Sequence, residues 1–237
     1  MLLYYITDRR QFPGDDAAQR RRLLDKIAEA AAAGVDYIQL REKDLCAREL
    51  QSLAREAVAV LRRVQPAPSR QSPAPKLLIN SRADVALACG ADGVHLRSDD
   101  VSPADVRALW SSAISRIQKL ETSNPLLAVS CHSMREVALA ESQGADFVVF
   151  APVFEKSDAP GVGLAALREA CHRAAFPSPN TEDRRAPSMP VLALGGITVE
   201  NARACAQAGA AGIAAIRLFQ ENDIAAIVAA LNRPKIT

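Results

Sequence analysis

The sequence predicts an α/β fold, a single-domain (β/α)8 barrel of the TIM type spanning residues 1–237, for three reasons. The length of 237 residues is ordinary for one such barrel. Short apolar runs alternate with helical patterns, eight of each, along the whole chain. One phrase, an alanine-rich helix followed by a glycine and an apolar run, recurs at intervals of roughly 55 to 65 residues, about two βα units.

The repeated phrase marks every second strand. Its glycines stand where the C-terminus of a helix needs a positive φ, and they are Gly34, Gly90, Gly144 and Gly209. The runs that follow them end at residues 38, 94, 148 and 213. These runs are apolar with little alternation, which is typical of buried parallel strands.

Four more strands and eight helices fill the intervals. The strands are expected at residues 2–7, 76–81, 126–133 and 190–196. The helices are expected at residues 23–33, 47–62, 83–89, 103–110, 134–143, 164–174, 199–208 and 224–231. Strict alternation with no edge strand left over favours a closed barrel. An open doubly wound sheet would carry GxGxxG after its first strand, where this chain reads DRRQFPG.

Two stretches interrupt the alternation. Residues 64–75 and 176–190 are rich in proline, serine and charge. Each follows a helix and precedes a strand, so both are expected at the N-terminal face of the barrel, away from the chemistry, as tolerated insertions.

The overall charge excludes some partners. A formal net charge of +2 is too small to indicate nucleic acid or a membrane surface. No apolar run reaches the roughly 18 residues that span a bilayer, and residues 1–10 lack the order of a signal peptide. We therefore expect a cytoplasmic protein that binds small molecules; whether it forms a homo-oligomer stays open.

Ligands of such barrels bind at the carboxyl ends of the strands. After the second strand, period two would aim Gln39, Arg41 and Lys43 to one side, where they could clamp a phosphate or diphosphate. The alternative is a set of surface charges paired with Glu42 and Asp44.

Later strand ends add polar groups. Asn80 and the Asp99–Asp100 pair are candidate partners for an anion and for Mg2+, although the aspartates also suit the start of a helix. Ser130 and His132 end the fifth strand without the G-x-S-x-G elbow of a nucleophilic serine, which favours anion contact.

The last two strands predict a phosphate site. Gly195 and Gly196 end the seventh strand just before a helix, and Arg217 follows the eighth. Backbone N–H groups of a glycine turn and a helix start are the usual phosphate ligands at this place in a barrel. A tight turn without a ligand is the alternative.

Several segments resemble the thiamine phosphate synthase family, in family order along nearly the whole chain. They are YIQLREK at 37–43, INSRAD at 79–84, GADGVHL at 90–96, SCH at 130–132, APVF at 151–154 and ALGGI at 193–197. The resemblance implies that an aminopyrimidine methyl diphosphate loses pyrophosphate while a thiazole phosphate attacks its methylene carbon. Fixed cations and Mg2+ would stabilise the leaving pyrophosphate.

The resemblance also implies roles for individual residues. The pyrimidine diphosphate would be held by Gln39, Arg41, Lys43, Asn80 and Ser130. Magnesium would bind Asp100, and Gly196 would hold the thiazole phosphate.

This chain departs from the family at three places. The second magnesium carboxylate is replaced by Ser81, which should weaken the metal site, and Asp84 or Asp99 could compensate. The T-x-T-K phosphate loop is replaced by EKSD at 155–158, in which Lys156 and Ser157 could still serve. A small serine after the eighth strand is replaced by Arg217, which could bind the thiazole phosphate or fill part of its site.

Related thiazole tautomerases share the barrel and move a proton on the thiazole ring. Their catalytic histidine falls at Pro152 here, so His132 would be the candidate base, or a packed histidine that orients the rim. Three hypotheses follow: a synthase, a tautomerase that needs no metal, and a thiamine-precursor binding protein without turnover.

Overall fold

A computed structural model describes residues 1–64, 74–116, 124–155, 160–175 and 189–232. Eight parallel strands follow one another in sequence order around a closed barrel, which confirms the predicted (β/α)8 fold. The strands are β1 (Leu2–Ile6), β2 (Tyr37–Leu40), β3 (Lys76–Asn80), β4 (Gly93–Leu96), β5 (Leu126–Cys131), β6 (Phe147–Phe150), β7 (Val191–Leu194) and β8 (Gly212–Ala215).

Helices separate the strands as expected. They are α1 (Asp16–Ala33), α2 (Ala47–Arg63), α3 (Ala83–Cys89), α4 (Pro103–Arg116), α5 (Met134–Ser142), α6 (Gly163–Ala175), α7 (Val199–Gln207) and α9 (Ile224–Asn232). Two short helices were not predicted, η1 (Arg9–Gln11) after β1 and α8 (Arg217–Gln220) after β8. Most of both proline-rich insertions, at 65–73 and 176–188, lies outside the described residues.

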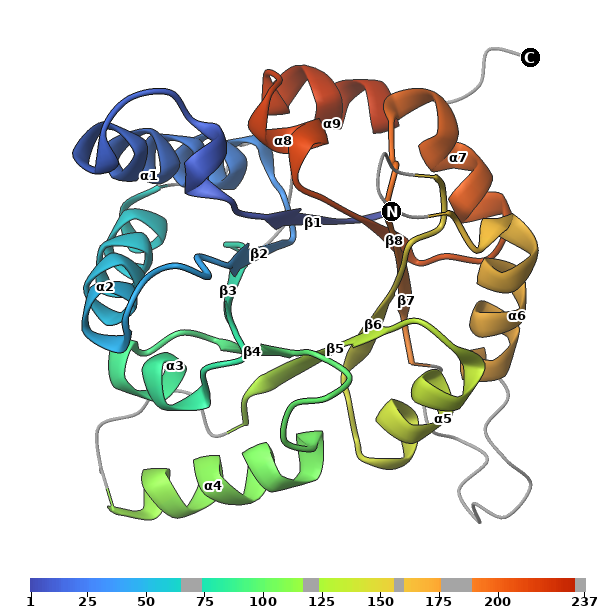
Figure 1. The fold of residues 1–237 in the computed structure, drawn as a ribbon, viewed down its shortest axis with the longest axis horizontal. Helices are drawn as coiled ribbons and strands as arrows, with labels where there is room; N and C mark the ends of the chain where they lie inside the picture. The colour runs from blue at the N-terminus through green and yellow to red at the C-terminus, as the bar shows by residue number, and fades with distance from the viewer. Residues whose placement is uncertain (65–73, 117–123, 156–159, 176–188, 233–237) are drawn as a thin grey trace. The chain divides into compact units, whose positions relative to one another are not determined.

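The chain forms two compact units. One comprises Leu2–Val94 and Ala215–Thr237, and the other comprises His95–Ala214 with Met1. In the first unit, helices α1, α2 and α3 lie outside strands β1, β2 and β3; in the second, α5, α6 and α7 lie outside β5, β6 and β7 (Figure 1). Most of the buried side chains are aliphatic or alanine, as the low aromatic content of 4% predicts, but the largest fully buried ones are aromatic. They are Trp110, Tyr4, Tyr5, Phe147, Phe150 and Phe219.

The four glycines of the repeated phrase adopt the predicted left-handed conformation. Their φ angles are 80° at Gly34, 69° at Gly90, 78° at Gly144 and 100° at Gly209. Only glycine takes this conformation without the clash of a Cβ atom, so each helix can end there and pass directly into a strand.

An aspartate two residues after three of these glycines joins neighbouring strands at their amino ends. A carboxylate oxygen of Asp36 accepts from the backbone N–H of Leu3 at 2.7 Å. Asp92 does the same for Leu77 at 2.9 Å, and Asp146 for Leu127 at 2.7 Å. The fourth repeat has Ala211, which keeps only a backbone bond from its N–H to the Val191 carbonyl at 2.9 Å. We call these three carboxylates the aspartate clamps.

Within the described residues, none of the helices is both long enough and apolar enough to cross a membrane.

Candidate active site

The end of β2 places the first predicted cations. Gln39 is buried at 1% exposure, whereas Arg41 is half-buried and Lys43 lies exposed in a turn. Because the strand ends at Leu40, the predicted alternation does not extend through Arg41 and Lys43. The backbone N–H of Arg41 instead donates to the hydroxyl of Thr7 at 3.0 Å, which fixes the segment to the end of β1.

A buried arginine engages the carboxylates around these cations. Arg9 is 4% exposed, and its guanidinium lies 2.6 Å from an Asp44 oxygen and 3.6 Å from a Glu42 oxygen. Within the described residues the guanidinium of Arg41 forms no ion pair, so the predicted alternative of local pairing with Glu42 and Asp44 does not hold for Arg41.

The pKa values of Asp44 and Glu42 are shifted in opposite directions, by charge in the first case and by burial in the second. The hydrogen bond from Arg9 lowers the pKa of Asp44. Burial raises the pKa of Glu42, although the Thr7 hydroxyl donates to it at 2.6 Å and the Arg9 N–H at 3.0 Å. Sequence reasoning missed Arg9. The available signal was its place just after the first strand, at the rim end of the predicted barrel.

The loop after β1 is held by a second buried group that the sequence analysis missed. Gln220 of α8 is 5% exposed and accepts at its Oε1 from the Tyr5 hydroxyl at 3.0 Å and from the Asp8 N–H at 3.1 Å. Its amide nitrogen donates to the Asp8 carbonyl at 2.6 Å. Arg217, the first residue of α8, is exposed.

A chain of amides continues from β2 to β3. The Gln39 side chain donates to Asn80 Oδ1 at 3.4 Å, and Asn80 Nδ2 donates to the Ser81 hydroxyl at 3.1 Å. Ser81 has a φ of +58°, the left-handed region in which aspartate and asparagine are enriched among residues with a side chain. The backbone at position 81 therefore suits the family aspartate better than the serine that is present.

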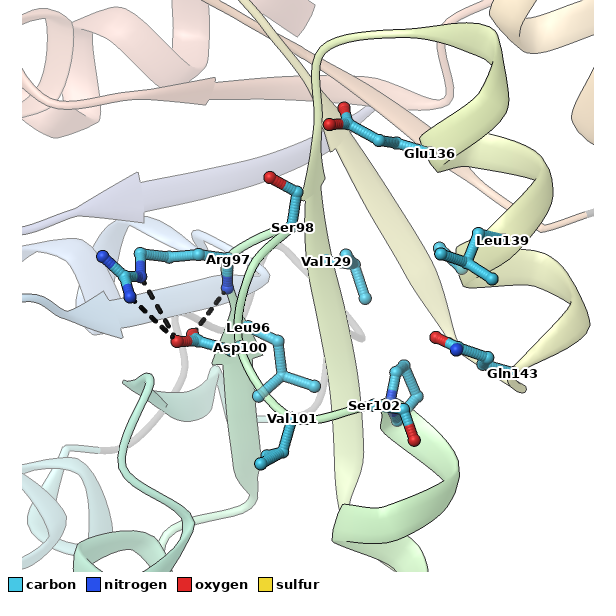
Figure 2. A pocket seen from close by; sticks show the side chains of 12 residues that line it. Leu96, Arg97, Ser98, Asp100, Val101, Ser102, Val129, Glu136, Leu139 and Gln143 are labelled. Carbon is cyan, nitrogen blue, oxygen red and sulfur yellow. Dashed lines mark hydrogen bonds and ion pairs between the residues drawn. The ribbon is translucent and has the colours of Figure 1, made fainter.

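The candidate magnesium carboxylate already has a cationic partner. Figure 2 shows Asp100 accepting from the backbone and the guanidinium of Arg97, at 2.8 Å and 3.2 Å. Asp99 lies 3.4 Å from the same guanidinium. The hydroxyl that accepts from the first turn of α4 is that of Ser102, so Asp100 is not the helix cap that the sequence allowed.

The cavity beside this loop is small. It lies between Asp100 and the face of α5 that carries Leu139, with Gln143 just after the helix (Figure 2), and its volume is about 30 Å3. That volume holds about one water molecule, so this cavity is not a substrate pocket.

Asp84, proposed above as a substitute ligand, is also engaged. Both of its oxygens accept from Arg82, at 2.8 Å and 2.5 Å, and this bidentate pair lowers the pKa of the Asp84 carboxyl. Within the described residues no group of three or more His, Cys, Asp or Glu side chains could hold a metal ion.

The two rim residues of β5 have different partners. The hydroxyl of Ser130 lies 2.8 Å from Nε2 of the buried His95. His132 is exposed, and its Nδ1 lies 2.8 Å from the carbonyl oxygen of Ala151. Because a carbonyl only accepts, Nδ1 carries the proton, and Nε2 of the neutral ring is the basic nitrogen.

The glycine turn after β7 is shaped by its packing. Gly195 and Gly196 have φ angles of 102° and 62°. A Cβ at Gly195 would lie 2.7 Å from the Cα of Pro152, and one at Gly196 would lie 2.8 Å from the Cβ of Phe154. Both positions thus need glycine because of the turn conformation and because the loop after β6 packs against them. These two structural reasons account for the glycines even if the turn binds no phosphate, which was the alternative interpretation of this motif.

The helix after this turn carries its own caps. The Thr198 hydroxyl accepts from the Asn201 N–H at 3.3 Å, and the Asn201 side chain accepts from the Thr198 N–H at 2.8 Å. These bonds use two of the donors at the start of α7, which leaves the turn's remaining N–H groups as candidates for a phosphate. Lys156, the other candidate phosphate ligand, lies outside the described residues.

Comparison with known proteins places the chain in a family. Residues 3–219 match the family described as thiamine monophosphate synthase. A putative thiamine-phosphate synthase 2 of Aquifex aeolicus is 35% identical over 222 residues, which is 92% of this chain and 97% of that protein. A putative thiamine-phosphate synthase of Geobacter sulfurreducens is 38% identical, over 90% of this chain and 84% of that protein.

A solved structure agrees with these relatives. The thiamine phosphate pyrophosphorylase from Pyrococcus furiosus superposes with a TM-score of 0.70 at 27% identity, covering 97% of this chain and 93% of the other. The sequence match, the identities and the common barrel together show that this chain belongs to the thiamine monophosphate synthase family.

Proposed function

We propose that this chain is a thiamine phosphate synthase, which joins an aminopyrimidine methyl diphosphate to a thiazole phosphate and releases pyrophosphate. One observation carries the proposal: within the described residues Arg41 forms no ion pair, because the neighbouring carboxylates Glu42 and Asp44 pair with Arg9 instead. A half-buried guanidinium without a carboxylate partner is suited to an anionic ligand, and a diphosphate accepts its bidentate hydrogen bonds.

Binding of the diphosphate is assigned to Gln39, Arg41, Lys43, Asn80 and Ser130. In the reaction the bond between the methylene carbon and the diphosphate oxygen breaks, and the thiazole nitrogen bonds to that carbon. Negative charge grows on the leaving pyrophosphate, so Arg41 and Lys43 act as catalytic residues that stabilise it. The amide chain from Gln39 to Asn80 orients the donors.

The thiazole phosphate is assigned to the turn of Gly195 and Gly196, with Arg217 and Lys156 as cationic partners. Backbone N–H groups in a glycine turn bind a phosphate without a side chain, and the exposed Arg217 adds a charge that can contact it in two places. This assignment makes Arg217 a replacement for part of the altered loop at 155–158.

Magnesium is assigned to Asp100, with Ser81 as a neutral oxygen ligand. This donor set fits Mg2+, because that ion accepts as little as one protein carboxylate when substrate phosphates and water complete its shell. The ion would neutralise charge on the diphosphate. Arg97 competes for Asp100, so we expect a weak site that is formed mainly in the presence of substrate.

One observation favours a second candidate function. The bond from His132 Nδ1 to Ala151 leaves its exposed Nε2 as the basic nitrogen, as a tautomerase would require of its general base. In that case His132 would be catalytic and no metal would be needed.

A two-substrate assay with and without Mg2+ tests both candidates. The synthase predicts magnesium-dependent thiamine phosphate that is lost in Arg41→Gln and retained in His132→Ala. The tautomerase predicts isomerisation of the thiazole phosphate that resists chelator and is lost in His132→Ala. Absence of thiamine phosphate at saturating Mg2+ would refute the synthase. Tight thiazole phosphate binding without turnover would select the precursor-binding protein.

A further inference from the structure

Arg9 is a buried cation that no part of the proposed reaction uses. It is 4% exposed and opens the short helix η1 directly after the loop that leaves β1. Its Nη2 lies 2.6 Å from Asp16, its Nη1 lies 2.6 Å from Asp44 and 3.6 Å from Glu42, and its backbone N–H donates to Glu42 at 3.0 Å. One guanidinium thus joins three carboxylates, one at the start of α1 and two in the loop after β2.

Two of these carboxylates stand next to the proposed diphosphate ligands. Glu42 follows Arg41 directly, and Lys43 lies between Glu42 and Asp44. Asp44 also lies 3.2 Å from the guanidinium of Arg10, which is 70% exposed and therefore strongly screened. Without the Arg9 guanidinium, Asp44 would keep only this screened partner and Glu42 would have no cation beside it, within one or two residues of the cations that must attract a diphosphate.

The same network fixes the backbone of the segment. The Thr7 hydroxyl donates to Glu42 at 2.6 Å and accepts from the Arg41 N–H at 3.0 Å. The Thr7 N–H donates to the Gln39 carbonyl at 3.0 Å. The segment that carries Arg41 is therefore held between the end of β1 and the carboxylate that Arg9 neutralises.

From this geometry we infer that Arg9 is a positioning residue for diphosphate binding: its single positive charge offsets part of the negative charge of Glu42 and Asp44, so that Arg41 and Lys43 can bind the anion. This inference rests on the proposed function, because it takes Arg41 and Lys43 as the diphosphate ligands. It makes Arg9 an electrostatic partner of the site without contact between Arg9 and the substrate.

The test is calorimetric titration with inorganic pyrophosphate in the absence of metal. Arg9→Gln should weaken binding about ten-fold, since the local net charge then becomes more negative by one unit and repels the ligand at short range. The triple variant Arg9→Gln, Glu42→Gln, Asp44→Asn removes one positive and two negative charges, so it should bind at least about as tightly as the wild type. Arg9→Lys should also retain affinity.

Asp16→Asn is the matched control. It removes an ion pair of Arg9 at the same distance, 2.6 Å, but changes no charge beside Arg41, so it should alter stability and leave pyrophosphate affinity unchanged. If Arg9→Gln fails to fold, Arg9→Gln with Glu42→Gln replaces it, since that pair of changes leaves only Asp44 unbalanced and should still bind more weakly than the triple variant.

Two results would overturn the inference. The first is wild-type affinity for pyrophosphate in folded Arg9→Gln. The second is a folded triple variant that binds pyrophosphate as weakly as Arg9→Gln, because removing the carboxylate charges would not rescue a purely structural role. In turnover assays Arg9→Gln should raise KM for the pyrimidine diphosphate and leave KM for the thiazole phosphate unchanged. If the wild type makes no thiamine phosphate, the proposed function fails, whereas the pyrophosphate titration still decides the role of Arg9.

Discussion

The aspartate clamps allow a stability prediction with a matched set of variants. In Asp36→Ala the backbone N–H of Leu3, a residue with 0% exposure, loses its carboxylate acceptor at 2.7 Å. Loss of a hydrogen bond to a charged group costs about 1.5–3 kcal/mol, and we take about 2 kcal/mol for this half-buried site. For a chain of this size that cost corresponds to a fall in Tm of about 4–8 °C.

The opposite change should be stabilising. Ala211 occupies the clamp position of the fourth repeat, where its N–H already donates to Val191 at 2.9 Å. Ala211→Asp would supply the missing carboxylate to the start of β7, with an expected gain of about 1 kcal/mol and a rise in Tm of about 2–4 °C.

Thermal unfolding followed by circular dichroism measures both changes. Asp25→Ala is the control, because Asp25 is exposed on α1 and its replacement changes the net charge equally. If Asp36→Ala lowered Tm no more than Asp25→Ala, the clamp would be a by-product of the fold that contributes nothing to its stability.

Three further predictions concern the rim. Ser81→Asp should lower the Mg2+ concentration for half-maximal synthesis about ten-fold, because aspartate adds a carboxylate ligand and suits the φ of +58° at this position. An unchanged Mg2+ requirement in the synthesis assay would contradict this prediction. Gly195→Ala should abolish soluble expression or lower the free energy of unfolding in urea by more than about 3 kcal/mol. Gly163→Ala, with φ of +83° and no atom within 4 Å of the added Cβ, should lower it by only about 1 kcal/mol. Equal losses of stability in the two variants would show that packing against Pro152 is not the cause. Arg9 lowers the pKa of Asp44 in the folded state, so the stabilisation from this pair is present above the unfolded pKa of about 3.9 and is lost as the pH falls through the lower folded pKa. The Tm difference between wild type and Asp44→Asn should therefore be full at pH 6 and vanish in strong acid. A Tm difference that persists in strong acid would refute the pairing.

Most of the fold was predictable because it depends on local rules. The glycines at helix ends and the apolar runs after them are set by φ preference and by burial on both faces of a parallel strand. The start of α1 was missed by seven residues, since Arg20, Arg21 and Arg22 interrupt the apolar pattern, although Asp15 caps the helix. Helix α8 is too short, at 4 residues, to show a period.

The rim was predictable in its residue types and less so in its pairings. Strand alternation was applied to Gln39, which lies in β2, but was carried three residues beyond the end of the strand, to Lys43. The partners of Glu42 and Asp44 depend on Arg9, which is more than thirty residues away in sequence and adjacent only after β1 and β2 pair. Asp84 was available as a ligand by sequence, yet its bond to Arg82 two residues earlier is a matter of side-chain rotamers.

The aspartate clamps stand at the amino ends of the strands, whereas the three motif departures noted above, at Ser81, Arg217 and the loop at 155–158, fall after carboxyl ends. The clamp residues and these three altered positions thus lie at opposite ends of the strands. Substitutions at these three positions can therefore change which ligands bind while the clamp hydrogen bonds stay intact, which makes this barrel a suitable scaffold for redesign.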